Sequence, residues 1–129
     1  MKPDIESRAD LEGLLRAFYE KAFADELIGH FFTKVVPLNL DTHIPVITDF
    51  WEAIIFNKHT YKKNVMVVHQ HIHHLSHIKK DHLDRWVQIF TGTVEEMFDG
   101  DKATLIKQRA TSIATIMDIK LNHNSINKL

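Results

Sequence analysis

Histidine is the residue type in this chain with the most obvious capacity for chemistry. Ten of the 129 residues are histidines, and six of these ten lie between His69 and His82. A neutral imidazole is the commonest protein ligand for a metal ion, and a single imidazole can hold haem iron. His69, His73 and His77 are spaced four residues apart, so a helix would place them on one face. The run therefore predicts one haem or metal ligand, a three-histidine metal site, or a solvated loop.

Three polar side chains on otherwise apolar helix faces form a second candidate site. Tyr19, His43 and Trp86 each fall on the apolar side of their own expected helix. A buried phenol, imidazole or indole needs a hydrogen-bond partner, so each can be a satisfied core residue. If the three converge, they create a polar pocket in an apolar core that suits a small polar ligand. No GxSxG, HExxH, P-loop or GxGxxG motif is present, and we predict no catalytic residue.

The composition excludes several classes of partner and chemistry. The formal net charge is −1, from 16 basic and 17 acidic side chains, so no nucleic-acid partner is expected. The chain has no cysteine, which excludes disulfides, iron–sulfur clusters and thiol catalysis. The first residues contain no apolar run typical of a signal peptide, and no uncharged apolar stretch is long enough to span a bilayer. We therefore expect a cytoplasmic protein with no membrane partner.

Helices must position these side chains. Apolar residues recur at spacings of three and four in four stretches, which predicts four long helices. A capping pair, Ser7 with Asp10, predicts the start of the first helix, and Pro45 is placed in the first turn of the second. The four are expected at about 7–23, from a cap at Asp41 or Thr42, from a cap at Asp81 to an end at Gly100, and from Asp101 onward.

The connections between these helices indicate how they pack. A short helical turn is expected over 25–32 and a loop over 57–64. The histidine run alternates as a strand would, but no partner strands are expected, so we predict a helical turn followed by a loop. Such a long connection weighs against a simple helix bundle, which leaves globin-like packing as the favoured alternative. The whole chain, 1–129, is predicted to be one all-α domain with a frayed tail at about 122–129.

Five sequence stretches carry a resemblance to a known family: AFYEKAFAD at 17–25, DFWEAIIF at 49–56, NVMVVH at 64–69, HLDRWVQIFTGTVEEMFDG at 82–100 and QRATSIATIMDIK at 108–120. In this order they resemble the group III truncated haemoglobins of the globin superfamily. Each stretch would be a weak match alone, but their order and spacing agree, and the resemblance extends from about Ile5 to Leu121. It implies a truncated-globin helical sandwich around haem b, between the second and third long helices.

The resemblance also implies a single proximal histidine on the haem iron. The histidine of NVMVVH is His69, and Trp86 of the Arg-Trp pair follows 17 residues later, as the family pattern requires. His73 is the main rival, because some members have a shorter connection. Two departures affect this choice, since Val65 replaces the usual proline and Lys63 a glycine. The remaining histidines of the run, His71, His74 and His77, are expected to be solvated or to form a loose surface metal site.

On the opposite, distal side of the haem, the resemblance assigns Tyr19, His43 and Trp86. Tyr19 and Trp86 would donate hydrogen bonds to bound O₂, so we expect slow O₂ release, and His43 would act as a gate or a weaker donor. The expected ligands are O₂, NO, CO or similar small molecules, with a reductase as an expected partner. Side chains expected to contact the haem are Phe32, Ile47, Trp51, Tyr61, Val68, Ile72 and Phe90.

Two other functions stay open. The first is a haem enzyme that oxidises NO with O₂ or performs peroxidase-like chemistry. The second, which sets the resemblance aside, is a nonhaem metal-binding helical protein built on the histidine run. A visible spectrum separates the second from the haem proteins, and turnover of NO or peroxide separates an enzyme from a carrier.

Overall fold

Helices make up most of the part of the chain that this computed structural model describes, which covers residues 2–57, 73 and 77–123. No strand occurs within these residues, so the all-α prediction is confirmed. None of the helices described is long and apolar enough to cross a membrane. In chain order the elements are α1 (Arg8–Ala24), the π-helical turn η1 (Phe31–Val35), α2 (Leu40–Ile55), α4 (Lys80–Met97), α5 (Asp101–Asp118) and a second π-helical turn, η2 (Ile119–His123).

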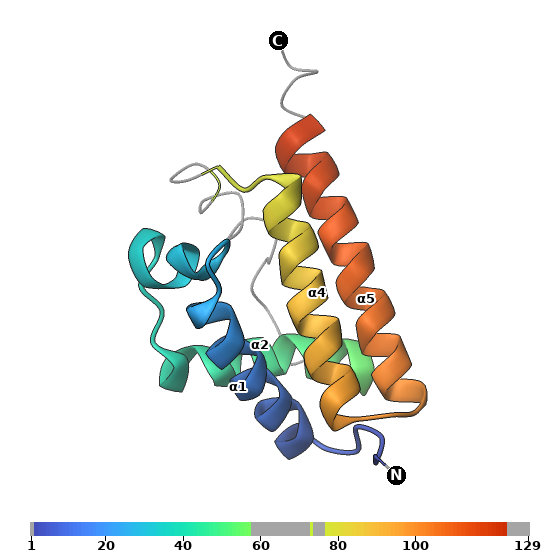
Figure 1. The fold of residues 1–129 in the computed structure, drawn as a ribbon. Helices are drawn as coiled ribbons and strands as arrows, with labels where there is room; N and C mark the ends of the chain where they lie inside the picture. The colour runs from blue at the N-terminus through green and yellow to red at the C-terminus, as the bar shows by residue number, and fades with distance from the viewer. Residues whose placement is uncertain (1, 58–72, 74–76, 124–129) are drawn as a thin grey trace.

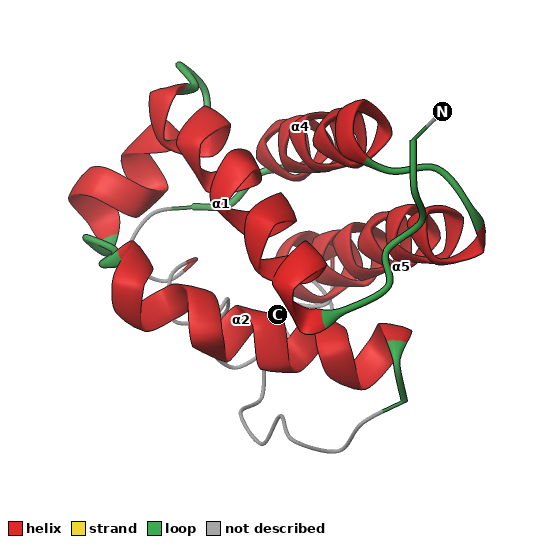
Figure 2. Ribbon diagram, turned by 90° about the horizontal axis from the view of Figure 1, so that it is seen from below, coloured by secondary structure: helices red, strands yellow, loops and turns green. Residues whose placement is uncertain are grey.

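The four long helices pack as two crossing pairs. Figure 1 shows α4 and α5 side by side and antiparallel, joined by a short connection at the lower end of the molecule. α1 packs on both α2 and α4, and α2 also contacts α5. The view from below shows α1 running diagonally between α4 and α2, with α5 beside α4 (Figure 2). This arrangement leaves the middle of the sandwich to be filled by side chains from all four helices.

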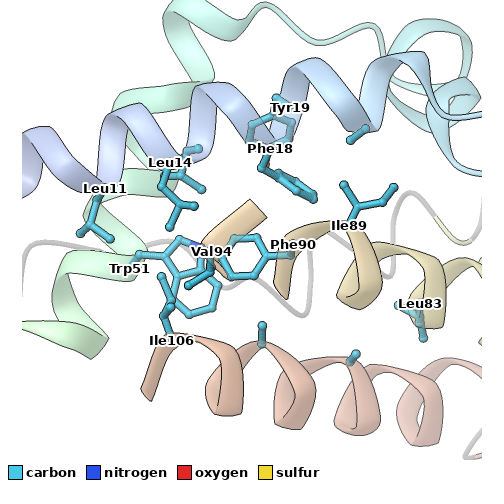
Figure 3. Close-up of a cluster of buried hydrophobic side chains, with 14 of the residues drawn as sticks. Leu11, Leu14, Phe18, Tyr19, Trp51, Leu83, Ile89, Phe90, Val94 and Ile106 are labelled. Carbon is cyan, nitrogen blue, oxygen red and sulfur yellow. The ribbon is translucent and has the colours of Figure 1, made fainter. Parts of the chain in front are cut away.

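An aromatic and aliphatic core fills the space where the helices cross. Trp51 of α2 stacks on Phe90 of α4 with ring centroids 5.3 Å apart and planes 17° from parallel (Figure 3). Phe18 of α1 meets the same Phe90 edge-on at 5.3 Å. All three side chains are almost completely buried. Large buried aromatic side chains contribute most to a helical core, so these contacts fix how α1, α2 and α4 cross.

Local capping decides where the first two long helices begin. Ser7 caps α1 by accepting the backbone N–H of Asp10, which confirms the predicted capping pair. α2 begins earlier than predicted, because Asn39 rather than Asp41 or Thr42 is its cap. The Asn39 side chain accepts the backbone N–H groups of both of those residues, at 2.9 and 3.4 Å. Pro45 therefore lies inside α2 and not in its first turn, so that prediction was wrong.

The ends of α4 also differ from the prediction. Asp81 is not its cap, because the helix already begins at Lys80. The backbone N–H of Lys79, the residue before the helix, donates instead to Nδ1 of His82 at 2.9 Å. α4 ends at Met97, and Gly100 directly precedes α5. At the other end of α5, the chain continues as η2 to residue 123, slightly beyond the predicted start of the frayed tail.

The N-terminal segment caps α5 from far away in the sequence. Oxygens of the Asp4 carboxylate accept the backbone N–H groups of Lys102 and Ala103 at 3.0 and 2.9 Å. Gly100 permits this approach, because it has φ +140° and a Cβ there would lie 2.5 Å from Cγ of Asp4. Burial alone would raise the pKa of Asp4, but the hydrogen bonds from Lys102, Ala103 and Ile5 outweigh it and hold the pKa below its ordinary value.

Replacing Asp4 with alanine should lower the free energy of unfolding by about 1–2 kcal/mol, as loss of a helix cap does. A carboxylate whose pKa is depressed on folding stabilises the protein above its unfolded-state pKa and loses that effect as the pH falls through the folded-state pKa. The difference in unfolding free energy between D4A and wild type should therefore be constant near neutral pH and shrink below about pH 4. Urea unfolding of both proteins at several pH values measures this difference. D99A is the control, because the exposed Asp99 side chain has no hydrogen bond or ion pair in the described part of the chain. Equal stability of D4A and wild type would contradict the cap.

Candidate functional site

A cavity of about 250 Å³ lies inside the sandwich and is walled by α1, η1, α2, α4 and α5. Its described lining is mostly aliphatic and aromatic, and Leu15, Phe31, Leu83 and Met117 are representative. Five lining side chains carry an N–H or O–H group: Tyr19, His43, Trp51, His82 and Trp86. A concave, mainly apolar pocket with a few polar groups is typical of a site for a small molecule or cofactor.

Four of the seven predicted haem contacts line this cavity together. They are Phe32 of η1, Ile47 and Trp51 of α2, and Phe90 of α4. The other three lie outside the described residues: Tyr61, Val68 and Ile72. The fold thus brings the four together from three elements, and their role as haem contacts stays a prediction.

Tyr19 and His43 meet at the cavity wall. Their Oη and Nε2 atoms are 2.8 Å apart, which joins α1 to the start of α2 through a side-chain hydrogen bond. Tyr19 is buried, and this burial raises the pKa of its phenol far above the ordinary value. The phenol therefore keeps its proton at neutral pH. Of the three polar side chains that could share one pocket according to the sequence, these two are therefore in direct contact.

Two phenylalanines hold the Tyr19 ring in place. Its centroid lies 6.3 Å from that of Phe23 and 5.8 Å from that of Phe32, with both contacts nearly perpendicular. Phe23 and Phe32 stack on one another at 5.5 Å. Because aromatic packing fixes the ring, the hydroxyl has little freedom to move away from the cavity wall.

Trp86 brings the third polar group to the same cavity. Its ring stacks on Phe90, with centroids 5.6 Å apart, and meets Phe18 edge-on at 6.2 Å. The ring is only half-buried, and no hydrogen-bond partner for its indole N–H is found in the described part of the chain. An indole N–H is a donor only, so Trp86 adds a donor-bearing side chain to the cavity lining.

His82 is a lining residue that the sequence reasoning missed. Its Nδ1 accepts the backbone N–H of Lys79, so the ring proton of the neutral form is on Nε2. Burial lowers the pKa of His82, and the nearby His30 and Lys79 lower it further, so the ring is neutral at physiological pH. The signal that could have found it is its position one helical turn before Trp86, which places both on one face of α4.

The structure describes only part of the histidine run. His69, the predicted iron ligand, lies outside the described residues, as do His71 and His74. The His73 and His77 rings lie with centroids 4.3 Å apart. No group of three or more His, Cys, Asp or Glu side chains that could hold a metal is found among the residues the structure describes.

His73 lies next to the cavity wall. Its Nδ1 accepts the backbone N–H of Ile78 at 2.9 Å, and Ile78 lines the cavity. A neutral imidazole has one lone pair available on nitrogen, so in this contact the proton is on Nε2. A metal ion could bind at Nε2 only after this hydrogen bond is lost. His73 is therefore near enough to rival His69, but in this conformation it is not prepared for coordination.

Comparison with known proteins supports the fold. The structure is similar to that of a group III truncated hemoglobin from Campylobacter jejuni, with a TM-score of 0.82 and 20% sequence identity. The match covers 96% of this chain and 98% of the other. No family model and no curated protein matches the sequence. The chain thus has the fold of a truncated haemoglobin, as the resemblance in sequence implied, and the roles of its site residues depend on the geometry above.

Proposed function

We propose that this protein binds haem b in the cavity and reversibly binds O₂ or a similar diatomic gas at the iron. The observation that carries the proposal is that Tyr19, His43 and Trp86 all line one mainly apolar cavity in a truncated-haemoglobin fold. A pocket for a gas needs few contacts, and the donors beside it decide how long the gas stays.

The side chains around the cavity suit a porphyrin. Trp51 and Trp86 both stack on Phe90 with planes 17° from parallel, so one stack of three rings forms an aromatic wall of the cavity. Such a wall would supply apolar surface against which a planar ring system can be buried, and haem would supply an iron position at which a gas can bind. For the proximal ligand we retain His69, with His73 as the rival.

Tyr19 and His43 can act together on a bound gas. The phenol has one proton, so it can donate to the gas only when His43 donates to its oxygen. The tautomer of His43 that carries the proton on Nε2 provides this donation across the 2.8 Å contact. Trp86 donates independently of that pair. In an apolar cavity these donors stabilise partial negative charge more than they would in water.

A haem enzyme is the second candidate, and the Tyr19–His43 hydrogen bond is the observation that favours it. A phenol joined to an imidazole can pass a proton to a reacting ligand. Turnover would also need electrons from a reductase, and we propose a cytoplasmic one. Consumption of NO or peroxide by the haem-loaded protein with a reductase would support this function. Gas binding without turnover would support the first.

Haem addition followed by CO tests the proposed function. Ferric haem should give a Soret band that saturates at one haem per chain, and CO should shift that band after reduction. The nonhaem alternative predicts a different outcome, in which Zn²⁺ or Ni²⁺ binds stoichiometrically and haem addition yields no saturable Soret band. Trp51→Ala is a useful comparison, because it removes part of the aromatic wall and should weaken haem uptake.

A further inference from the structure

A salt bridge joins α4 to the turn that follows α1. Nε and Nη2 of Arg85 each lie 2.7 Å from Oδ1 of Asp25. The Asp25 side chain is only 7% exposed, whereas that of Arg85 is 39% exposed. Arg85 also donates from Nη1 to Gln88, so contacts at both ends hold its guanidinium in one orientation. Two-pronged contacts of this kind add geometric specificity to an ion pair.

The second oxygen of Asp25 holds the turn itself. Oδ2 accepts the backbone N–H groups of Leu27 and Ile28 at 3.0 and 3.1 Å. One carboxylate therefore joins the start of this segment to α4. Burial alone would raise the pKa of Asp25, but the hydrogen bonds from Arg85, Ile28 and Leu27 outweigh it and hold the pKa below its ordinary value.

Each side of the salt bridge leads directly to the cavity. Trp86 follows Arg85 in α4, and Ile28 of the turn lines the cavity, as does Phe31 after it. The turn has little room to adjust on its own. A Cβ at Gly29 would lie 2.5 Å from the backbone oxygen of Phe23, so the turn packs closely on the end of α1. Loss of the salt bridge would therefore release the contact that ties the Arg85 segment of α4, and with it Trp86, to this wall.

We propose that Arg85 is a positioning residue that, through Asp25, sets where the Trp86 indole N–H points in the cavity. This inference rests on the proposed function in one respect, since the bound gas is the acceptor that makes the indole orientation matter. Arg85 itself does not line the cavity. Arg85 would act on the gas indirectly, because the α4 backbone connects it to Trp86.

A second ion pair, between α1 and α4, provides the matched control. Lys21 of α1 and Glu96 of α4 lie 2.6 Å apart, but their side chains are 41% and 66% exposed. Neither residue lines the cavity. Exposed pairs of this kind contribute little to stability, and this one has no contact that leads to the site. Lys21→Gln thus removes a bridge between α1 and α4 without touching the proposed positioning contact.

The test compares Arg85→Gln, Arg85→Lys and Lys21→Gln with wild type in the haem-loaded ferrous protein. The first readout is the O₂ dissociation rate, and the second is the Trp86 indole N–H resonance in the ¹⁵N-labelled CO complex, assigned with Trp86→Phe. Arg85→Gln should shift that resonance and raise the rate about 2- to 30-fold. Arg85→Lys should restore part of both effects, because it keeps the charge but loses the two-pronged geometry. Lys21→Gln should change neither.

The outcomes distinguish failure of the positioning role of Arg85 from failure of the proposed haem function. An unchanged Trp86 resonance and O₂ rate in haem-loaded Arg85→Gln would overturn the positioning role. A wild type that takes up no haem would refute the proposed function instead, and the indole resonance of the haem-free protein would still decide the positioning role. If Arg85→Gln does not fold, Asp25→Asn and Arg85→Lys provide the same comparison, since both weaken the contact and retain hydrogen-bonding capacity.

Discussion

Replacing Tyr19 with phenylalanine should speed O₂ release from the haem-loaded ferrous protein by about 10- to 100-fold. A hydrogen bond to a charged acceptor contributes about 1.5–3 kcal/mol, and each 1.4 kcal/mol is a tenfold change. The buried phenol keeps its proton over the physiological pH range, so it can donate to the gas whenever His43 donates to its oxygen. Stopped-flow displacement of O₂ by CO measures the rate.

The same variant contains its own control. Phenylalanine keeps the ring and its packing against Phe23 and Phe32, so only the hydroxyl is removed. CO carries less charge than O₂ when bound and accepts a weaker hydrogen bond, so the CO dissociation rate should change much less. An O₂ rate equal to that of wild type would show that Tyr19 does not donate to the gas. Equal acceleration for both gases would show that the substitution opened the cavity instead.

Replacing His69 with alanine should remove the proximal ligand and with it the five-coordinate ferrous spectrum. A single imidazole holds the iron in this arrangement, so no other side chain is expected to compensate. His73→Ala should leave the spectrum unchanged, and His71→Ala is the matched control from the same run. Addition of free imidazole to His69→Ala should restore the spectrum, because the small molecule can occupy the vacated position.

The outcome for the two histidines separates three accounts. Loss of the spectrum in His73→Ala alone would make His73 the ligand, and the hydrogen bond from Ile78 to its Nδ1 would have to break on haem binding. Loss in neither variant would refute histidine ligation from these two positions. Partial loss in both would indicate that either histidine can reach the iron.

Sequence periodicity predicted the helices better than their ends. The spacing of apolar residues identified the buried faces because burial repeats with the helical turn, and Leu11, Leu14 and Phe18 are all buried. The start of α2 was harder, because Asn39, Asp41 and Thr42 are all good caps and only one can precede the helix. The cap that Asp4 provides for α5 joins residues 98 and 99 positions apart, so no local pattern could reveal it.

In the candidate site, too, local patterns predicted the helix faces but not the contacts between helices. Helix faces placed Tyr19, His43 and Trp86 on apolar surfaces, but the Tyr19–His43 hydrogen bond depends on how α1 crosses α2. His82 was missed because it closes the histidine-rich segment, whose members were interpreted as candidate ligands or solvated residues. The Arg85–Asp25 pair was missed because its partners are 60 residues apart and each resembles an ordinary surface charge.

A crystal structure of the haem-loaded ferrous protein with CO would show where the haem and the gas bind. We expect haem in the cavity lined by Trp51 and Phe90, with Oη of Tyr19 and Nε1 of Trp86 on the same side of the haem as the gas. We also expect a histidine from the run 69–77 on the opposite side. Haem bound elsewhere, or Tyr19 and Trp86 on the histidine side, would refute the proposed site.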